Sequence, residues 1–146
     1  MNFKGKEIGK MVLDLDGTLY PLGKTEAMWD GVRRKLAIAI LNVDGHNPSD
    51  DEVLDMIRRW MEMSRDAGWR ESYKELGGNS EKFVEVADGA NRAGCLDYDP
   101  KLVEVLKKLS LNGVEVDVFT GALRRQAEDT LNVLLGAENK LVSKLL

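Results

Sequence analysis

Two short apolar runs, far apart in the sequence, have the pattern of buried β-strands. The first is Gly9–Leu15, closed at once by Asp16-Gly17, and the second is 114–119, followed by the small polar pair Thr120-Gly121. Continuous apolar runs of this length that end in turn residues are typical of strands covered on both faces of a sheet. We therefore predict two buried strands that end in polar side chains.

Nearly one hundred residues separate these runs, and their apolar positions recur at helical spacing. The first helical stripe consists of Met28, Val32, Leu36, Ile40 and Val43. Asp44-Gly45 should end this helix, Ser49–Glu52 has the pattern of a capping box that opens the next one, and Gly77-Gly78 should separate it from a third. The pattern predicts a helical subdomain over residues 23–92, inserted into a core formed by 1–22 and 93–146.

After Gly94 the pattern changes to alternating helix and strand. Asp99-Pro100 begins a helix that Asn112-Gly113 ends, the second strand follows, and another helix runs from Leu123 to about Leu135. This alternation predicts an α/β fold with a parallel sheet, in which ligands collect at the carboxyl ends of the strands. Asp14, Asp16, Thr120 and Gly121 all belong to that edge.

Composition narrows the classes of partner. The chain has 146 residues, 43% of them hydrophobic and 32% charged, with a formal net charge of −4 and mixed signs along the sequence. This predicts a globular protein for which nucleic acid and anionic membranes are unfavourable partners. The single cysteine cannot form an internal disulfide, no apolar run approaches the ~20 residues of a membrane span, and no secretion signal is evident, so we predict a cytoplasmic protein.

The first strand carries the clearest candidate chemistry. Asp14 and Asp16 are spaced i, i+2 at its end, so their side chains point in nearly the same direction and could reach one reacting centre. Gly17-Thr18 then lets the backbone turn sharply and offer N–H groups to an anion. Because crowded carboxylates repel each other, a divalent cation is the natural way to keep both ionised, and oxygen ligands favour Mg²⁺.

The run Asp14-Leu15-Asp16-Gly17-Thr18-Leu19-Tyr20, with the apolar residues before it, resembles the first signature motif of the haloacid dehalogenase superfamily. The strand 116–119 with Thr120-Gly121 resembles the second motif of that family, an apolar strand ending in Thr or Ser. A helical insertion between the two resembles the family's cap. The resemblance implies a Rossmann-like core with a helical cap inserted after the first strand.

The resemblance also implies a reaction. Asp14 would attack phosphorus and form an aspartyl-phosphate, and Asp16 would protonate the leaving oxygen and then activate water. Thr120 would bind the phosphoryl oxygens, helped by backbone N–H groups near Gly17, Thr18 and Gly121. Magnesium would bind the Asp14 carboxylate and the main-chain carbonyl of Asp16. An acid at position 16 favours hydrolysis of a small phosphomonoester over carbon–halogen cleavage.

The sequence departs from the family after its second motif. The family's lysine motif and its later metal-binding aspartates have no convincing match, and Lys140–Leu146 resembles only its third strand. Three interpretations stay open: a magnesium-dependent phosphatase, a truncated relative that is weak or inactive and acts by binding or self-association, and a piece of a longer protein.

In the family a fourth strand lies beside the first, so here the strand 11–15 is expected to leave an apolar edge unpaired. Either the chain's own N-terminal segment or cap covers this edge, or a second copy of the chain does; we favour the second copy, as a homodimer or through an exchange of elements. Asp117 is unusual, because it is a charge inside a predicted buried strand; it could line the site or face an uncovered side of the sheet.

Overall fold

The computed structural model describes residues 2–3, 6–42, 45 and 47–146, and it divides the chain into two compact units. We call residues 1–26 and 91–146 the core unit, and residues 27–90 the helical unit. Arg92, which the sequence assigned to the insertion, therefore belongs to the core unit. The predicted helix positions Val43 and Asp44 lie outside the described residues.

The core unit contains a three-stranded parallel sheet in the order β3-β4-β5. Strand β3 spans Lys10–Asp14, β4 spans Glu115–Phe119 and β5 spans Lys144–Leu145. In register, Lys10 lies beside Glu115 and Asp14 beside Phe119. The coarse prediction of an α/β fold with a parallel sheet is confirmed. The sequence had not predicted the separate hairpin of β1, Asn2–Phe3, and β2, Lys6–Glu7.

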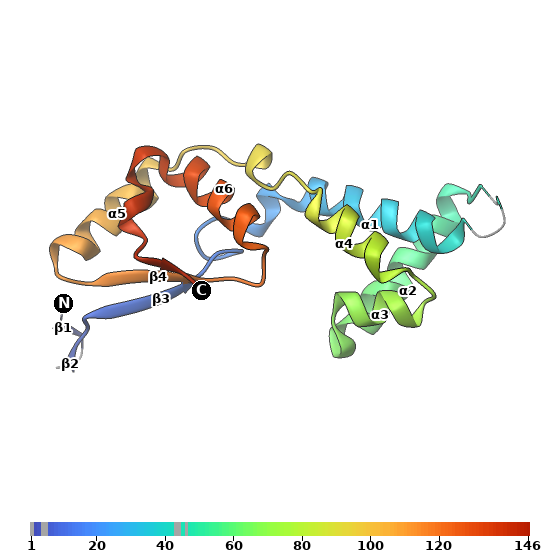
Figure 1. Cartoon of the computed structure of the whole chain (residues 1–146), viewed down its shortest axis with the longest axis horizontal. Helices are drawn as coiled ribbons and strands as arrows, with labels where there is room; N and C mark the ends of the chain where they lie inside the picture. The colour runs from blue at the N-terminus through green and yellow to red at the C-terminus, as the bar shows by residue number, and fades with distance from the viewer. Residues whose placement is uncertain (1, 4–5, 43–44, 46) are drawn as a thin grey trace. The chain divides into compact units, whose positions relative to one another are not determined.

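Both long helices of the core unit lie on the same side of this sheet (Figure 1). They are α5, Pro100–Leu111, and α6, Arg124–Leu135. Along the chain, β4 lies beside β3 and β5 lies beyond β4, so each new strand is added at the same edge of the sheet. Right-handed crossovers that all run in this direction place both helices on one face. The remaining short helices of the unit are η1 (Leu22–Lys24), η2 (Ala93–Cys95) and η3 (Gly136–Leu141). The core packs between the sheet and these helices, and includes Leu15, Val116, Val118, Leu106 and Leu131.

The opposite face of the sheet differs from the prediction that its strands are covered on both sides. Within the described part of the core unit, Val12 on this face is 54% exposed and Phe119 is also exposed. Asp117 alternates with the core residues of β4 and therefore lies on the same open face, where neighbouring strands leave it only 3% exposed. Lys10 Nζ lies 3.0 Å from its carboxylate, and this hydrogen bond raises the pKa of Lys10. The charge in the strand is thus compensated by its neighbour on β3.

The helical unit is built around aromatic side chains. Its helices are α1 (Glu26–Leu41, whose first residue belongs to the core unit), α2 (Asp50–Ala67), α3 (Trp69–Glu75) and α4 (Ser80–Asp88). Trp60 and Tyr73 are fully buried, and the Trp60 ring lies within 5.6 Å of the ring centroids of both Tyr73 and Trp69. The Trp60 and Trp69 rings pack edge to face and the Trp60 and Tyr73 rings are tilted, and such aromatic pairs add to the stabilisation from the area that the rings bury.

The boundaries of the helices in this unit can be compared with those predicted from the sequence. At the start of α2 the Ser49 side chain accepts from Glu52 N–H at 3.4 Å, and Ser49 N–H donates to Glu52 at 2.8 Å, which confirms the predicted capping box. The expected break at Gly77-Gly78 is present, but the chain also breaks at Gly68, between α2 and α3. Gly68 has a φ of 79°, a left-handed conformation that glycine adopts without steric cost.

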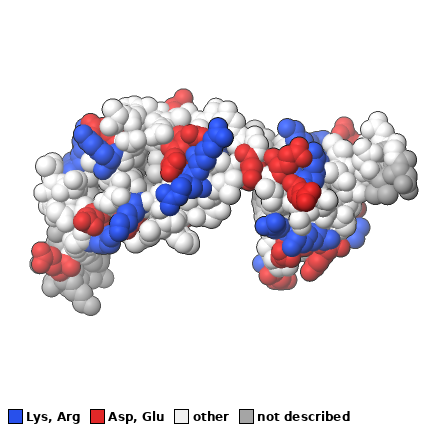
Figure 2. Space-filling model, in the orientation of Figure 1, with Lys and Arg blue, Asp and Glu red and all other residues white. Residues whose placement is uncertain are grey.

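Acidic and basic side chains lie beside one another on the face shown in Figure 2. Several form pairs one helical turn apart, such as Lys74 with Glu71 at 2.8 Å and Lys108 with Glu104 at 2.6 Å. Among the described helices, none combines the length and the apolar character that crossing a membrane requires.

Candidate functional site

The sheet register brings the predicted site residues of two strands to one edge. Asp14 is the last residue of β3 and pairs with Phe119, so Thr120 follows directly beside it. Neighbouring strands lie about 4.8 Å apart, so the backbones of Asp14 and Thr120 lie close together at the carboxyl edge of the sheet. The backbone N–H of Thr120 also donates to Leu146 at 3.4 Å, which fixes the chain after β4 against the end of β5.

The turn after β3 is held at both ends by buried side chains. Leu15 and Leu19 belong to the core, and Leu19 N–H donates to the Leu15 carbonyl at 3.1 Å. Between them Gly17 has a φ of 80°, and a Cβ at this position would lie 3.2 Å from Leu22 Cγ. The turn therefore requires glycine, and it leaves Gly17 and Thr18 exposed at the surface where the sequence predicted anion binding.

Asp16 is held by two contacts that the sequence did not predict. The Tyr20 hydroxyl donates to Asp16 Oδ1, and Arg92 Nε lies 3.5 Å from the same oxygen. Both partners are buried, and the Arg92 side chain is only 6% exposed against 28% for that of Asp16. Burial, and then the hydrogen bond to Asp16, raise the pKa of Tyr20, so this hydroxyl stays a donor across the physiological range.

Asp14 differs from Asp16 in its surroundings. Its side chain is exposed and makes no ion pair with any other residue that the structure describes. Two carboxylates only two positions apart thus have different environments, one accessible and one fixed by a phenol and a guanidinium. A carboxylate that must approach phosphorus needs access, whereas one that exchanges a proton needs a defined position, so this difference fits the roles expected for Asp14 and Asp16.

Thr120 is oriented by the turn that follows β4. Its Oγ1 accepts from the backbone N–H of Ala122 at 3.1 Å, a local side-chain bond that fixes the hydroxyl while leaving its hydrogen free to donate. Gly121 is exposed beside it. Arg124, which opens α6, contacts Glu128 at 3.8 Å and the Leu145 carbonyl at 3.4 Å, so its guanidinium is engaged along the helix and with β5.

The donor atoms at this edge are of the kind that Mg²⁺ prefers. The Asp14 carboxylate and the main-chain carbonyl of Asp16 are hard oxygen ligands, and Mg²⁺ usually keeps several waters beside one or two carboxylates. The donor set therefore fits the ion. Within the described residues, no group of three or more His, Cys, Asp or Glu side chains is arranged to hold a metal.

A small cavity is lined in part by Tyr20, whose hydroxyl donates to Asp16. It has a volume of about 220 Å³ and is lined by Tyr20, Lys24, Asp97 and Tyr98 among others. Lys24 Nζ lies 3.7 Å from the Asp97 carboxylate, so the rim carries a solvated ion pair.

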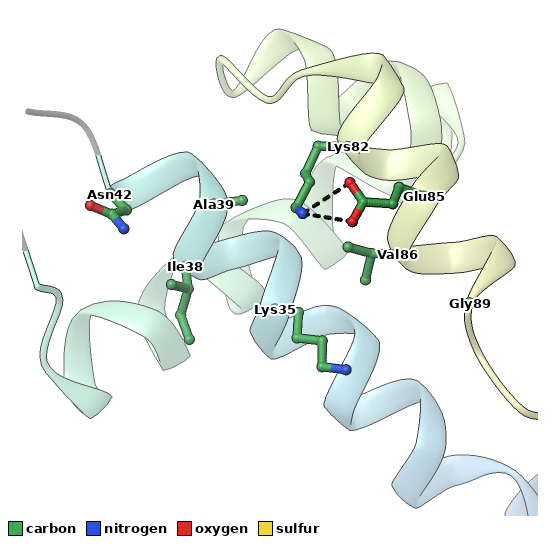
Figure 3. Close-up of a pocket in the computed structure, with 8 residues that line it drawn as sticks. All are labelled: Lys35, Ile38, Ala39, Asn42, Lys82, Glu85, Val86 and Gly89. Atoms are coloured by element: carbon green, nitrogen blue, oxygen red, sulfur yellow. Dashed lines mark hydrogen bonds and ion pairs between the residues drawn. The ribbon is translucent and has the colours of Figure 1, made fainter. Parts of the chain in front are cut away.

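The helical unit has a larger groove of its own between α1 and α4 (Figure 3). Its volume is about 510 Å³, with Ile38 and Val86 among its apolar lining. Lys82 Nζ is bound to Glu85 at 3.0 Å, while Lys35 projects from α1. The groove is open and mixed in character, and it contains no pair of groups suited to bond cleavage, so the sheet edge is the better candidate for chemistry.

No protein-family model matches the chain, and no curated protein matches its sequence. The functional assignment therefore depends on the residues at the sheet edge and on the motifs that they form.

Proposed function

We propose that the chain is a magnesium-dependent phosphohydrolase of the haloacid dehalogenase type, acting on a small phosphomonoester. The observation that carries the proposal is the pairing of β3 with β4, because it puts Asp14, Asp16 and Thr120 at one edge. We also propose that the core unit is a Rossmann-like core and the helical unit its cap. The strand order and the position of the insertion between β3 and α5 support this assignment.

In the first half of the proposed reaction, an Asp14 carboxylate oxygen attacks phosphorus and the bond to the ester oxygen breaks. Asp16 gives a proton to that oxygen, which leaves as an alcohol. In the second half Asp16 takes a proton from water, and the resulting hydroxide attacks the phosphorus of the aspartyl-phosphate. Inorganic phosphate leaves and the Asp14 carboxylate is restored.

The other residues of the edge bind and position. The Thr120 hydroxyl and the N–H groups around Gly17 and Gly121 donate to the phosphoryl oxygens. Tyr20 and Arg92 act as positioning residues, because they fix the Asp16 carboxylate from two directions. Magnesium, held by the Asp14 carboxylate and the Asp16 carbonyl, would offset the negative charge of the phosphoryl group.

The test is phosphate release from a panel of small phosphomonoesters, with and without Mg²⁺. We expect release only with Mg²⁺, and its loss in Asp14→Asn, because an amide is a poor nucleophile and a weaker metal ligand. Asp129→Asn is the matched control, since Asp129 is an exposed carboxylate on α6. A phosphorylated Asp14 peptide after acid quenching would support the intermediate, and undiminished turnover in Asp14→Asn would remove Asp14 from the mechanism.

Asp16→Asn separates proton transfer from binding. We expect kcat to fall by roughly 10²–10⁴-fold with KM little changed, because a positioned acid or base contributes about this much. Equal losses in KM and kcat would instead assign Asp16 a role in binding.

A second candidate function follows from the unpaired edge of β3. If the chain releases no phosphate from any ester of the panel but associates with itself, the observation favours a relative that keeps the fold and acts through binding. Mass measurement and phosphate release together distinguish the two functions.

A further inference from the structure

Strand β3 has a free edge. Within the described residues it pairs only with β4, and Figure 1 shows it as the outer strand of the sheet. The carbonyl of Gly9 accepts from Glu115 N–H at 2.9 Å, which fixes the direction of the backbone groups along the strand. Because these groups alternate, Met11 and Leu13 also bond toward β4, while Lys10, Val12 and Asp14 direct their N–H and C=O groups away from the sheet.

The sequence of this edge is complementary to itself. Reading Lys10 to Asp14 against the same segment reversed places Lys10 opposite Asp14, Met11 opposite Leu13 and Val12 opposite Val12. Opposite charges therefore meet at both ends. A parallel arrangement in register would instead place Lys10 beside Lys10 and Asp14 beside Asp14, and like charges directly opposite each other destabilise a sheet.

The side-chain faces also match. In an antiparallel pair, directly opposite residues lie on the same face of the sheet. Leu13 packs against the core and Met11 lies on the same face of β3. These two residues would meet Met11 and Leu13 of the second copy, so the apolar layer would continue from one sheet into the next. Val12, which is 54% exposed in the single chain, would meet its own counterpart.

We propose that β3 is a dimer interface: two copies pair antiparallel through this edge, with Val12 on the two-fold axis, and form one continuous six-stranded sheet from two sheets of three. All the outward-facing backbone groups of Lys10, Val12 and Asp14 are then used in the ladder, because the three residues fall at hydrogen-bonded positions of this register. The interface is isologous, so it closes on itself and stops at two copies. Lys10 of each copy lies opposite Asp14 of the other in this register, and its ammonium also contacts Asp117 of its own chain at 3.0 Å.

The register can be tested through Val12. We expect light scattering at tens of micromolar to give twice the 16.3 kDa chain mass for the unaltered protein. Val12→Lys and Val12→Glu should each give the chain mass, because like charges would meet on the axis, and an exposed position tolerates either side chain in the fold. Mixing the two variants in equal amounts should restore the double mass, since a lysine of one chain would then face a glutamate of the other on the axis.

The matched control is Val105→Lys on α5, where the valine is 53% exposed, and this variant should keep the double mass. Far-ultraviolet circular dichroism confirms that each variant is folded. A measured mass of 16.3 kDa for the unaltered protein would overturn the proposal, and the edge of β3 would then be open to another segment of the chain or to a different partner. A double mass that persists in Val12→Lys would place the interface elsewhere, and failure of the mixture to associate would rule out the Val12 axis.

Discussion

The contact between Asp16 and Arg92 can be measured as a coupling free energy. At the observed 3.5 Å, two unit charges attract by about 5 kcal/mol if the effective dielectric constant is about 20. Desolvation of the buried guanidinium offsets part of this attraction, while the 28% exposure of Asp16 lets water replace part of what a substitution removes. We therefore expect a net coupling of roughly 1–3 kcal/mol, between the values typical of exposed and of fully buried pairs.

A double-mutant cycle isolates this coupling from the other contacts of either residue. The four proteins are the unaltered chain, Asp16→Asn, Arg92→Met and the double variant, with urea unfolding followed by far-ultraviolet circular dichroism. Methionine keeps much of the arginine's apolar length, so lost packing contributes less than lost charge. A coupling below about 0.5 kcal/mol would mean that the two side chains act independently, and Arg92 would then not be a positioning residue for Asp16.

Two further predictions concern stability. Burial raises the pKa of Tyr20 above 10.0, so the contribution of Tyr20 to the free energy of unfolding is present below pH 10 and is lost as the pH rises further. In Tyr20→Phe the free energy of unfolding should therefore fall less steeply above pH 10. The same pH profile in both proteins would contradict a raised pKa for Tyr20. Gly78→Ala should destabilise the helical unit by roughly 1–3 kcal/mol in urea unfolding, because its Cβ would lie 2.3 Å from the buried Tyr73 ring. The control Gly31→Ala, in α1 with open space around it, should instead stabilise by about 0.5–1 kcal/mol, and equal effects would refute the steric reasoning.

The elements with strong local signals could be predicted from sequence. The apolar runs around Met11 and Val116 became β3 and β4, and the capping box at Ser49 became the start of α2. These signals are local, because a buried strand or a helix cap is specified by residues within a few positions of one another. The neighbouring positions of Asp14 and Thr120 also followed, since parallel strands align their carboxyl ends.

The contacts around Asp16 could not be predicted, because their cause is not local. Arg92 lies at the other end of the insertion, and the only sequence signal was a charged residue close to the predicted return to the core. Tyr20 was part of the recognised motif, yet nothing in its spacing indicates that the turn brings its hydroxyl back to Asp16. The open face of the sheet was missed for a related reason: an apolar run predicts burial, but the number of helices available to cover it depends on the whole topology.

The aromatic centre of the helical unit has a spectroscopic consequence. The chain has three tryptophans, and Trp29, Trp60 and Trp69 all lie within residues 27–90. Intrinsic tryptophan fluorescence therefore reports on the helical unit alone, whereas ellipticity reports on both units. If the two signals change at different urea concentrations, the units unfold separately and a single unfolding free energy does not describe the chain. A ligand that shifts the emission maximum would, by the same reasoning, have altered the surroundings of α1, α2 or α3.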